Sequence, residues 1–283
     1  MGWGFCTVKT LLLDLLTQSP ERLTILVVDG SEYLAQLRTL YPNAEIHAVT
    51  PYEDITAHSS VAHLSIHWYV LDWRCDPLPF GEEMFDRIIA EFAIESAYEP
   101  YDTLMALNRQ LKETGTLYTS YTNVRYHTIL DALRMGHFPV CSEQHLYAKP
   151  EIVRLLNDSL YKEIHFIPGE QDDDPTAAFA WEQEGFENFS ADLLTRVWLI
   201  RAERSSAAAS NLKYFFTREI RHRIALLLHR IEYGISPVEN IAELHIICIK
   251  EGVFRTYLED FITQICIHPE NVYSALYEIF EEI

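Results

Sequence analysis

Short apolar runs alternate with amphipathic stretches through roughly the first two thirds of the chain. The runs are rich in β-branched residues, as buried parallel strands are, and the stretches between them repeat apolar residues at helical spacing. Strands that alternate with helices form βαβ units, so the pattern predicts a doubly wound, mostly parallel sheet. The predicted strands are Leu23 to Val28, Glu45 to Val49, Ser65 to Leu71, Phe85 to Ala90 and Gly115 to Tyr121.

Helices are predicted around these strands, and two further strands follow them. The helices cover Val8 to Leu16, Ser31 to Leu40, Tyr101 to Leu111, His127 to Met135 and Pro150 to Asn157. The later part of this region predicts a short strand, an acidic loop and a last strand, at Glu163 to Ile167, Gly169 to Pro175 and Leu193 to Ala202.

The pattern changes to helices alone after a small, polar segment, Ser205 to Asn211, which predicts a domain boundary. We therefore expect an α/β domain over residues 1–204 and a helical domain over residues 205–283. Ser236-Pro237-Val238-Glu239 predicts a capping box at the start of a helix that Gly252 ends. The other helices expected here are residues 213–233, Phe254 to Ile267 and Pro269 to Glu282.

The net charge of −20 excludes some classes of partner. A surface this acidic repels phosphate backbones and anionic lipids, so neither nucleic acid nor a membrane is an expected partner. The five cysteines are odd in number and form no C-x-x-C pair, which argues against a disulfide framework or a zinc site and favours a reducing cytosol. No apolar run approaches the roughly 20 residues that a membrane-spanning helix needs.

Several short motifs occur in a fixed order between residues 20 and 160. An aspartate after the third strand precedes Leu-Pro-Phe and Phe-Asp, and an Asn-Val-Arg segment follows the fifth strand. In this order the chain resembles the class I S-adenosylmethionine (SAM)-dependent methyltransferases, most closely a subgroup associated with bacterial surface-glycan and natural-product pathways. The resemblance implies a seven-stranded sheet whose last strand is inserted antiparallel.

The resemblance also implies where SAM would bind. The cofactor residues would be Asp29, Gly30, Ser31, Thr50, Asp72, Trp73 and Glu91. Of the three glycines expected in the first turn only Gly30 is present, and Thr50 stands where the family has the acid that binds the ribose, although Glu53 or Asp54 could reach back to it. Glu32 and Tyr33 would crowd the methionine part of SAM if they faced the pocket. Asp72 would bind the adenine amino group and Trp73 would cover the ring; alternatively Asp72 caps a turn and Trp73 packs in the core.

Family position makes His127 and His145 the candidates for a general base, although a histidine in a loop is more often structural or exposed. The resemblance implies a sugar, a glycan precursor or a small metabolite as methyl acceptor. The alternative is a catalytically inactive methyltransferase-like module, a partner or scaffold that binds another protein or a second copy through its C-terminal helices. A third reading is a module that holds a different nucleotide in the same crevice.

Overall fold

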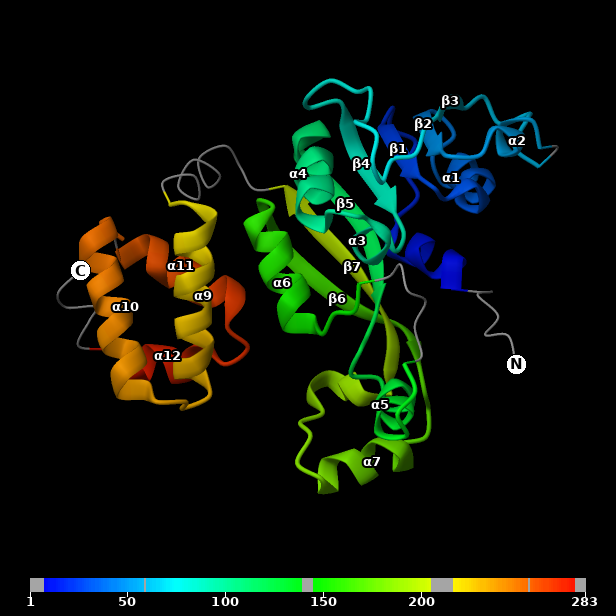
Figure 1. Ribbon diagram of the computed structural model, residues 1–283. Helices are drawn as coiled ribbons and strands as arrows, with labels where there is room; N and C mark the ends of the chain where they lie inside the picture. Colours follow the sequence, from blue (N-terminus) through cyan, green and yellow to red (C-terminus); the bar gives the residue numbers. More distant parts are fainter. Residues whose placement is uncertain (1–7, 59, 139–144, 205–215, 254, 278–283) are drawn as a thin grey trace. The chain divides into compact units, whose positions relative to one another are not determined.

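The computed structural model describes residues 8–58, 60–138, 145–204, 216–253 and 255–277. The chain packs into two compact units (Figure 1). The first comprises Met1–Lys149 and Glu163–Arg204, and the second comprises Pro150–Lys162 and Ser205–Ile283. The second unit thus includes a segment that precedes the last strand of the first. Ser205 to Asn211 lies outside the described residues, and the predicted domain boundary stays a prediction.

The first unit is built on a seven-stranded sheet with the order β3-β2-β1-β4-β5-β7-β6. Neighbouring strands from β3 to β5 pair in parallel, and β7 pairs antiparallel with β5. The predicted doubly wound sheet and its antiparallel last strand are therefore confirmed. The strands are β1 Thr24–Val28, β2 Glu45–Thr50, β3 His67–Val70, β4 Phe85–Ala90, β5 Leu111–Thr122, β6 Tyr161–Gln171 and β7 Thr195–Arg204.

Helices flank this sheet, and most lie where the apolar periodicity predicts them. They are η1 Val8–Leu15, η2 Ser31–Tyr33, α1 Leu34–Leu40, α2 Glu53–Thr56, α3 Ala93–Ser96, α4 Pro100–Gln110, α5 His127–Arg134, α7 Thr176–Gln183 and η3 Phe189–Leu194.

Several details differ from the sequence expectation. The first helix is a 3-10 helix, and α2, α3 and α7 are not predicted; α2 and α3 have only four residues each, too few for an apolar repeat. The helix η3 is not predicted either, and its Leu193 and Leu194 belong to the predicted last strand. Strand β6 continues to Gln171, so the first residues of the predicted acidic loop belong to the sheet edge.

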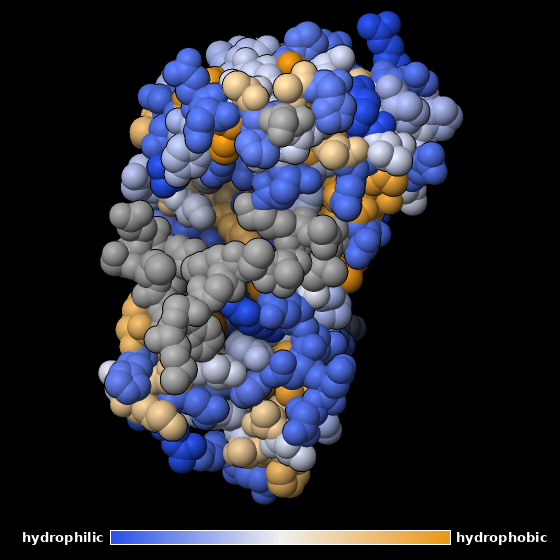
Figure 2. Space-filling model, turned by 90° about the vertical axis from the view of Figure 1, so that its right-hand side faces the viewer, coloured by the Kyte–Doolittle hydropathy of each residue, from blue (hydrophilic) through white to orange (hydrophobic). Residues whose placement is uncertain are grey.

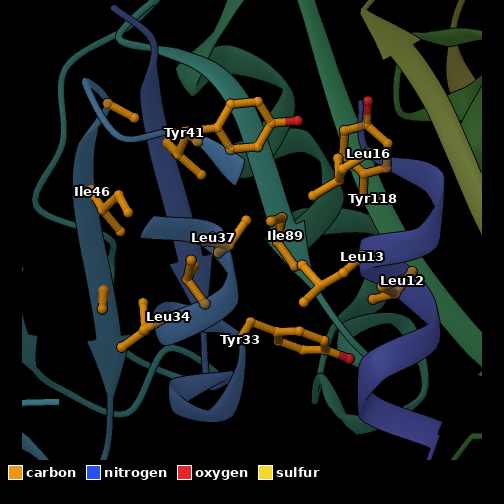
Figure 3. Packing of buried hydrophobic residues seen from close by; sticks show 14 of the residues in the cluster. Leu12, Leu13, Leu16, Tyr33, Leu34, Leu37, Tyr41, Ile46, Ile89 and Tyr118 are labelled. Carbon is orange, nitrogen blue, oxygen red and sulfur yellow. The ribbon is translucent and has the colours of Figure 1, made fainter. Parts of the chain in front are cut away.

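The main core of the first unit lies between the sheet and the η1, η2 and α1 helices. Leu12, Leu13, Leu34 and Leu37 are buried there against the apolar side chains of β1 and β2. Figure 3 shows Tyr33 among them, with its ring directed from η2 toward η1 and Leu13. This packing fixes the position of the first turn after β1, where the resemblance places the cofactor.

The second unit is helical, as the sequence predicts, and one face of the helix expected within residues 213–233 lies in its core. Ile224, Leu227, Leu228 and Ile231 of one helix are all buried. Its helices are α6 Lys149–Asp158, whose first residue belongs to the first unit, α9 Arg218–Glu232, α10 Pro237–Glu251, α11 Arg255–Ile265 and α12 Pro269–Ala275. Residues 278–282 of the last predicted helix lie outside the described residues.

The helix α10 begins at Pro237 as predicted, but the predicted capping box is wrong. Ser236 adopts a left-handed conformation (φ 38°) and its side chain makes no capping hydrogen bond. Instead, the Asn240 amide donates to the carbonyl oxygens of Ile235 at 2.7 Å and Ser236 at 3.0 Å. Gly252 follows the helix with φ 68°, so the predicted glycine end is confirmed.

The face of the molecule drawn in Figure 2 is largely hydrophilic. On the face shown in Figure 2, hydrophobic residues occur singly or in small groups among hydrophilic ones. Within the described ranges, no helix has the length and apolarity that crossing a bilayer requires.

Candidate functional site

The candidate site lies at the carboxyl ends of β1 and β4. The chain runs outward from β1 through β2 to β3, then returns to place β4 on the other side of β1, so the strand order reverses between β1 and β4. Ligands of doubly wound sheets bind in the crevice outside such a point. The side chains that line this crevice therefore decide whether a cofactor can enter.

The turn after β1 is a tight bend at Asp29 and Gly30. Asp29 is exposed and has a left-handed backbone (φ 50°), and its N–H donates to the Val49 carbonyl at 2.9 Å. A Cβ atom on Gly30 would lie 2.8 Å from Cδ2 of the Tyr33 ring and 3.2 Å from Cγ1 of Val27. Glycine is needed here because the tyrosine ring fills the space beside the bend.

Tyr33 spans the crevice from this bend to the end of β4. Its side chain is 1 % exposed, and its hydroxyl lies beside the carboxylate of Glu91, the residue that follows β4. Burial and the negative charge of the nearby Glu91 both raise the pKa of Tyr33, so the phenol stays protonated. Gly30 and Glu91, both expected cofactor residues, are therefore brought together with an aromatic ring between them.

Ser31 and Thr50 show no ligand-like arrangement. The Ser31 hydroxyl donates to the Glu32 carboxylate at 3.4 Å. Thr50, the last residue of β2, is 2 % exposed, and its hydroxyl oxygen accepts from the Tyr52 N–H at 3.3 Å. A hydroxyl so enclosed presents little surface to a ribose.

Asp72 follows β3, where the resemblance expects it, but its carboxylate is bound to the side chain of Arg74. Its carboxylate accepts from Nε of Arg74 at 2.8 Å and from the second guanidinium nitrogen at 3.0 Å, and it also accepts from the Arg74 backbone N–H. These bonds to Arg74 hold the pKa of Asp72 below its usual value. The turn-capping role is present in the structure, and the adenine-binding role stays a prediction.

Trp73 and Arg74 form one wall of a cavity of about 450 Å³ at the carboxyl end of β1. Trp73 is 7 % exposed, and its indole Nε1 is buried without a hydrogen-bond partner. The opposite wall is the face of α4 that carries Asp102 and Leu107, and Val28 closes the end. The cavity has room for a nucleoside-sized group, and Arg74, the one cation among the described residues that line it, is already bound to a carboxylate.

Glu95 of α3 is a buried acid that the sequence reading did not assign to the site. It is 2 % exposed and accepts from the Thr122 N–H at 2.7 Å and the Thr122 hydroxyl at 3.3 Å. Burial raises the pKa of Glu95 to about 7, against the lowering effect of the Thr122 bonds. The available signal was a glutamate placed between Ile94 and Ala97 in an otherwise apolar segment after β4.

The two candidate histidines differ in environment. His127 lies at the start of α5, and its Nε2 is 2.7 Å from Oδ2 of Asp172, the residue after β6. The Tyr126 hydroxyl donates to the same carboxylate oxygen at 2.8 Å. His145 is exposed, and its backbone N–H donates to the Glu95 carbonyl at 2.9 Å. The catalytic role of both histidines stays a prediction.

The Asn-Val-Arg motif has a structural role at the end of β5. The Asn123 amide is fully buried and donates to the carbonyl and carboxylate oxygens of Asp192 and to the carbonyl of Thr195, at 2.8 to 3.0 Å. Arg125 adds an ion pair to the Asp192 carboxylate at 2.7 Å. The motif thus joins the end of β5 to the start of β7 instead of facing the crevice between β1 and β4.

These residues do not fit SAM as they are arranged. The methionine part would have to lie over the Gly30 bend, where the Tyr33 ring packs. The strand β2 ends on Thr50 and not on a carboxylate, and the acids that follow it, Glu53 and Asp54, are exposed on α2. The cavity of about 450 Å³ beside β1 lies toward the nucleoside end of this binding mode. Among the described residues, no group of histidine, cysteine, aspartate or glutamate side chains is arranged to hold a metal ion.

Comparisons with known proteins give weak matches. No family model matches the chain, and no curated protein is similar to it. Among solved structures it is similar to a chain of the complex between the Haloferax volcanii Trm112 methyltransferase activator and a methyltransferase (19 % identity over 70 % of this chain and 89 % of that chain, TM-score 0.49). It is similar also to a SAM-dependent methyltransferase from Mesorhizobium loti (16 %, 70 % and 98 %, TM-score 0.49) and to the [4+2]-cyclase SpnF (14 %, 71 % and 80 %, TM-score 0.48).

Similarities this low carry no argument about activity, and the assignment of fold rests on the strand order. A sheet ordered β3-β2-β1-β4-β5-β7-β6, with β7 antiparallel to β5, is the arrangement that the resemblance implies. The chain therefore has the Rossmann-like methyltransferase fold, with a helical second unit.

Proposed function

We propose that this chain is a methyltransferase-like module that does not take up SAM and acts as a binding partner or scaffold. The observation that carries this proposal is the Tyr33 ring, which fills the crevice between the Gly30 bend and Glu91. SAM binding by the mode of the family would require the ring to leave a core in which it is 1 % exposed. Moving a buried aromatic side chain costs several kcal/mol.

Two other contacts support the same proposal. Thr50 offers one enclosed hydroxyl where a carboxylate would take both ribose hydroxyls. The Asp72 carboxylate is engaged by the Arg74 guanidinium, so an adenine amino group would compete with a charge-assisted, bidentate hydrogen bond. Each of the three groups that would recognise SAM at this crevice is thus already in contact with another part of the protein.

Calorimetric titration with SAM and S-adenosylhomocysteine at millimolar concentration tests the proposal. We expect neither binding heat nor a rise in melting temperature for the full chain. Tyr33→Phe is the matched variant: it keeps the ring and should also show no binding. Saturable heat with the unaltered protein would contradict the proposal.

A second candidate is SAM-dependent methyl transfer to a sugar, a glycan precursor or a small metabolite. The cavity of about 450 Å³ beside β1 favours it, because a nucleoside end could enter there. The acceptor class comes from the resemblance to the glycan and natural-product subgroup. A positive titration, weakened by Asp72→Ala, would support this candidate over the first.

A further inference from the structure

The helix α10 presents apolar side chains to solvent along one face. Val238 is 76 % exposed, Ile246 63 % and Ile249 67 %, and Ala242 between them is exposed too. At 100° per residue these four positions fall on one stripe of the helix. Ile235, in the turn that enters the helix, is 56 % exposed and extends the stripe at its N-terminal end.

The opposite face of α10 is already used. Leu244 and Cys248 are buried in the core of the helical unit, with Ile241 and Ile247 partly buried beside them. A helix that is apolar on both faces is normally covered on both. The outer face of the adjacent α9 is of the usual polar kind, with exposed His222, Arg223 and Arg230.

The stripe is suited to a second copy of itself. Val238 and Ile246 are each four residues from Ala242, one on either side, so an antiparallel copy related by a twofold axis at Ala242 places Val238 against Ile246 in both directions. Alanine at the axis allows two helices to approach closely. A protein partner of unrelated sequence would not require this symmetry.

Charges beside the stripe fit the same pairing. Glu239 and Lys250 lie on the same flank of the stripe, 20° apart at 100° per residue, near opposite ends of the helix. A twofold axis between antiparallel helices keeps this flank on the same side and exchanges the two helix ends. Glu239 of one copy therefore lies on the same side of the pair as Lys250 of the other copy, toward the same end. With the axis at Ala242 the two are offset by five residues, about 7.5 Å along the helix, which their long side chains can span.

The overall charge does not oppose this contact. Residues 205–283 hold seven lysines and arginines against eleven aspartates and glutamates, a small part of the net charge of −20. The repulsion that such a net charge produces therefore falls mainly on the first unit, and it is screened beyond about 10 Å at ordinary salt.

We propose that α10 is a self-association surface, on which two copies of this chain pair antiparallel through Val238, Ala242, Ile246 and Ile249. The pairing goes beyond the proposed function and does not depend on it, because Tyr33 and the crevice belong to the other unit. The titration with SAM and the dimerisation assay therefore succeed or fail separately.

Sedimentation velocity of the full chain over a range of concentrations tests the pairing. We expect a dimer that Ile246→Glu weakens at least about tenfold, because the new charge would be buried without a partner. Met135→Glu, at a residue 74 % exposed in the first unit, is the matched control and should leave the dimer intact. Circular dichroism establishes that both variants fold.

Charge reversal tests the antiparallel register. Glu239→Lys and Lys250→Glu should each weaken the dimer, and the two together should restore it. If the protein stays monomeric at a concentration of about 100 μM, the proposal is overturned. A dimer that Ile246→Glu leaves intact overturns it too. A dimer that the double reversal fails to restore overturns the antiparallel arrangement.

Discussion

The hydroxyl of Tyr33 lies beside the carboxylate of Glu91, across the carboxyl ends of two neighbouring strands. The contact joins the turn after β1 to the turn after β4, the two turns between which a cofactor of this fold would lie. In this chain the two turns are joined by a packed aromatic ring and a polar contact. A substitution that opens the crevice must therefore disturb the core at the same time.

Removal of the Tyr33 ring should destabilise the protein strongly. We expect Tyr33→Ala to lower the free energy of unfolding by about 3 to 5 kcal/mol, since it leaves a cavity between η1 and η2. Tyr33→Phe keeps the ring and should cost about 1 to 2 kcal/mol, from the lost polar contact of the hydroxyl with Glu91. Urea denaturation measures both. Equal losses for the two variants would show that the ring itself contributes little.

Glu95 should make the protein less stable as the pH rises. Its pKa is raised by burial to about 7 in the folded state, so the folded protein binds its proton more tightly than the unfolded chain does. The resulting stability is present below the unfolded pKa of about 4.3 and is lost as the pH rises through 7. Between pH 5 and pH 8 we expect Glu95→Gln to gain about 2 kcal/mol relative to the unaltered protein, measured by urea denaturation. Glu99→Gln, at an exposed position, is the control and should show no such gain.

His47 should have the opposite effect. Burial lowers its pKa, the neighbouring His67 lowers it further, and Glu45 opposes both. The folded protein therefore holds the neutral ring, and stability falls as the pH drops below the unfolded pKa of about 6.5. We expect His47→Phe to reduce the loss of stability between pH 7.5 and pH 5.5. If the exposed His63→Gln reduces it equally, the effect does not come from burial.

Asn123 should be among the most sensitive polar positions. Its fully buried amide donates to Asp192 of η3 and to Thr195, the first residue of β7. Asn123→Ala leaves the carbonyl oxygens of these two residues without this donor and should cost about 2 to 4 kcal/mol in the free energy of unfolding. Asn43→Ala is the comparison, since that exposed amide makes one hydrogen bond, to Pro20 at 2.8 Å, and should cost under about 1 kcal/mol.

Most of the fold could be predicted because local pattern and tertiary structure agree. The apolar runs of β1 and β4 are the buried strands that their composition indicates, and the apolar repeat from Ile224 to Ile231 is the core face of α9. The capping box at Ser236 could not be predicted correctly, because the left-handed backbone at Ser236 turns its side chain away from the helix. That conformation depends on the preceding turn, which no periodicity describes.

The site was less predictable for a similar reason. The sequence shows that Tyr33 follows a turn with one glycine in place of three, but the direction of its ring depends on Leu13 of η1, which packs beside it (Figure 3). The partner of Asp72 is two residues away, and only the fold of the turn brings the Arg74 guanidinium back to it. The buried state of Glu95 likewise depends on β5, which lies far along the chain from it.

The second unit is assembled from two separated parts of the chain, and this has a consequence for synthesis and for dissection of the gene. Residues 150–162 leave the ribosome before β7 and long before α9. The helix α6 is therefore synthesised before the other helices of its unit, α9 to α12, exist. A fragment that stops at Arg204 retains this helix without them, and a fragment that begins at Ser205 lacks it. Expression of either fragment alone thus gives a second unit that lacks part of its chain, whereas a polypeptide that spans both segments supplies residues 150–162 together with residues 205–283.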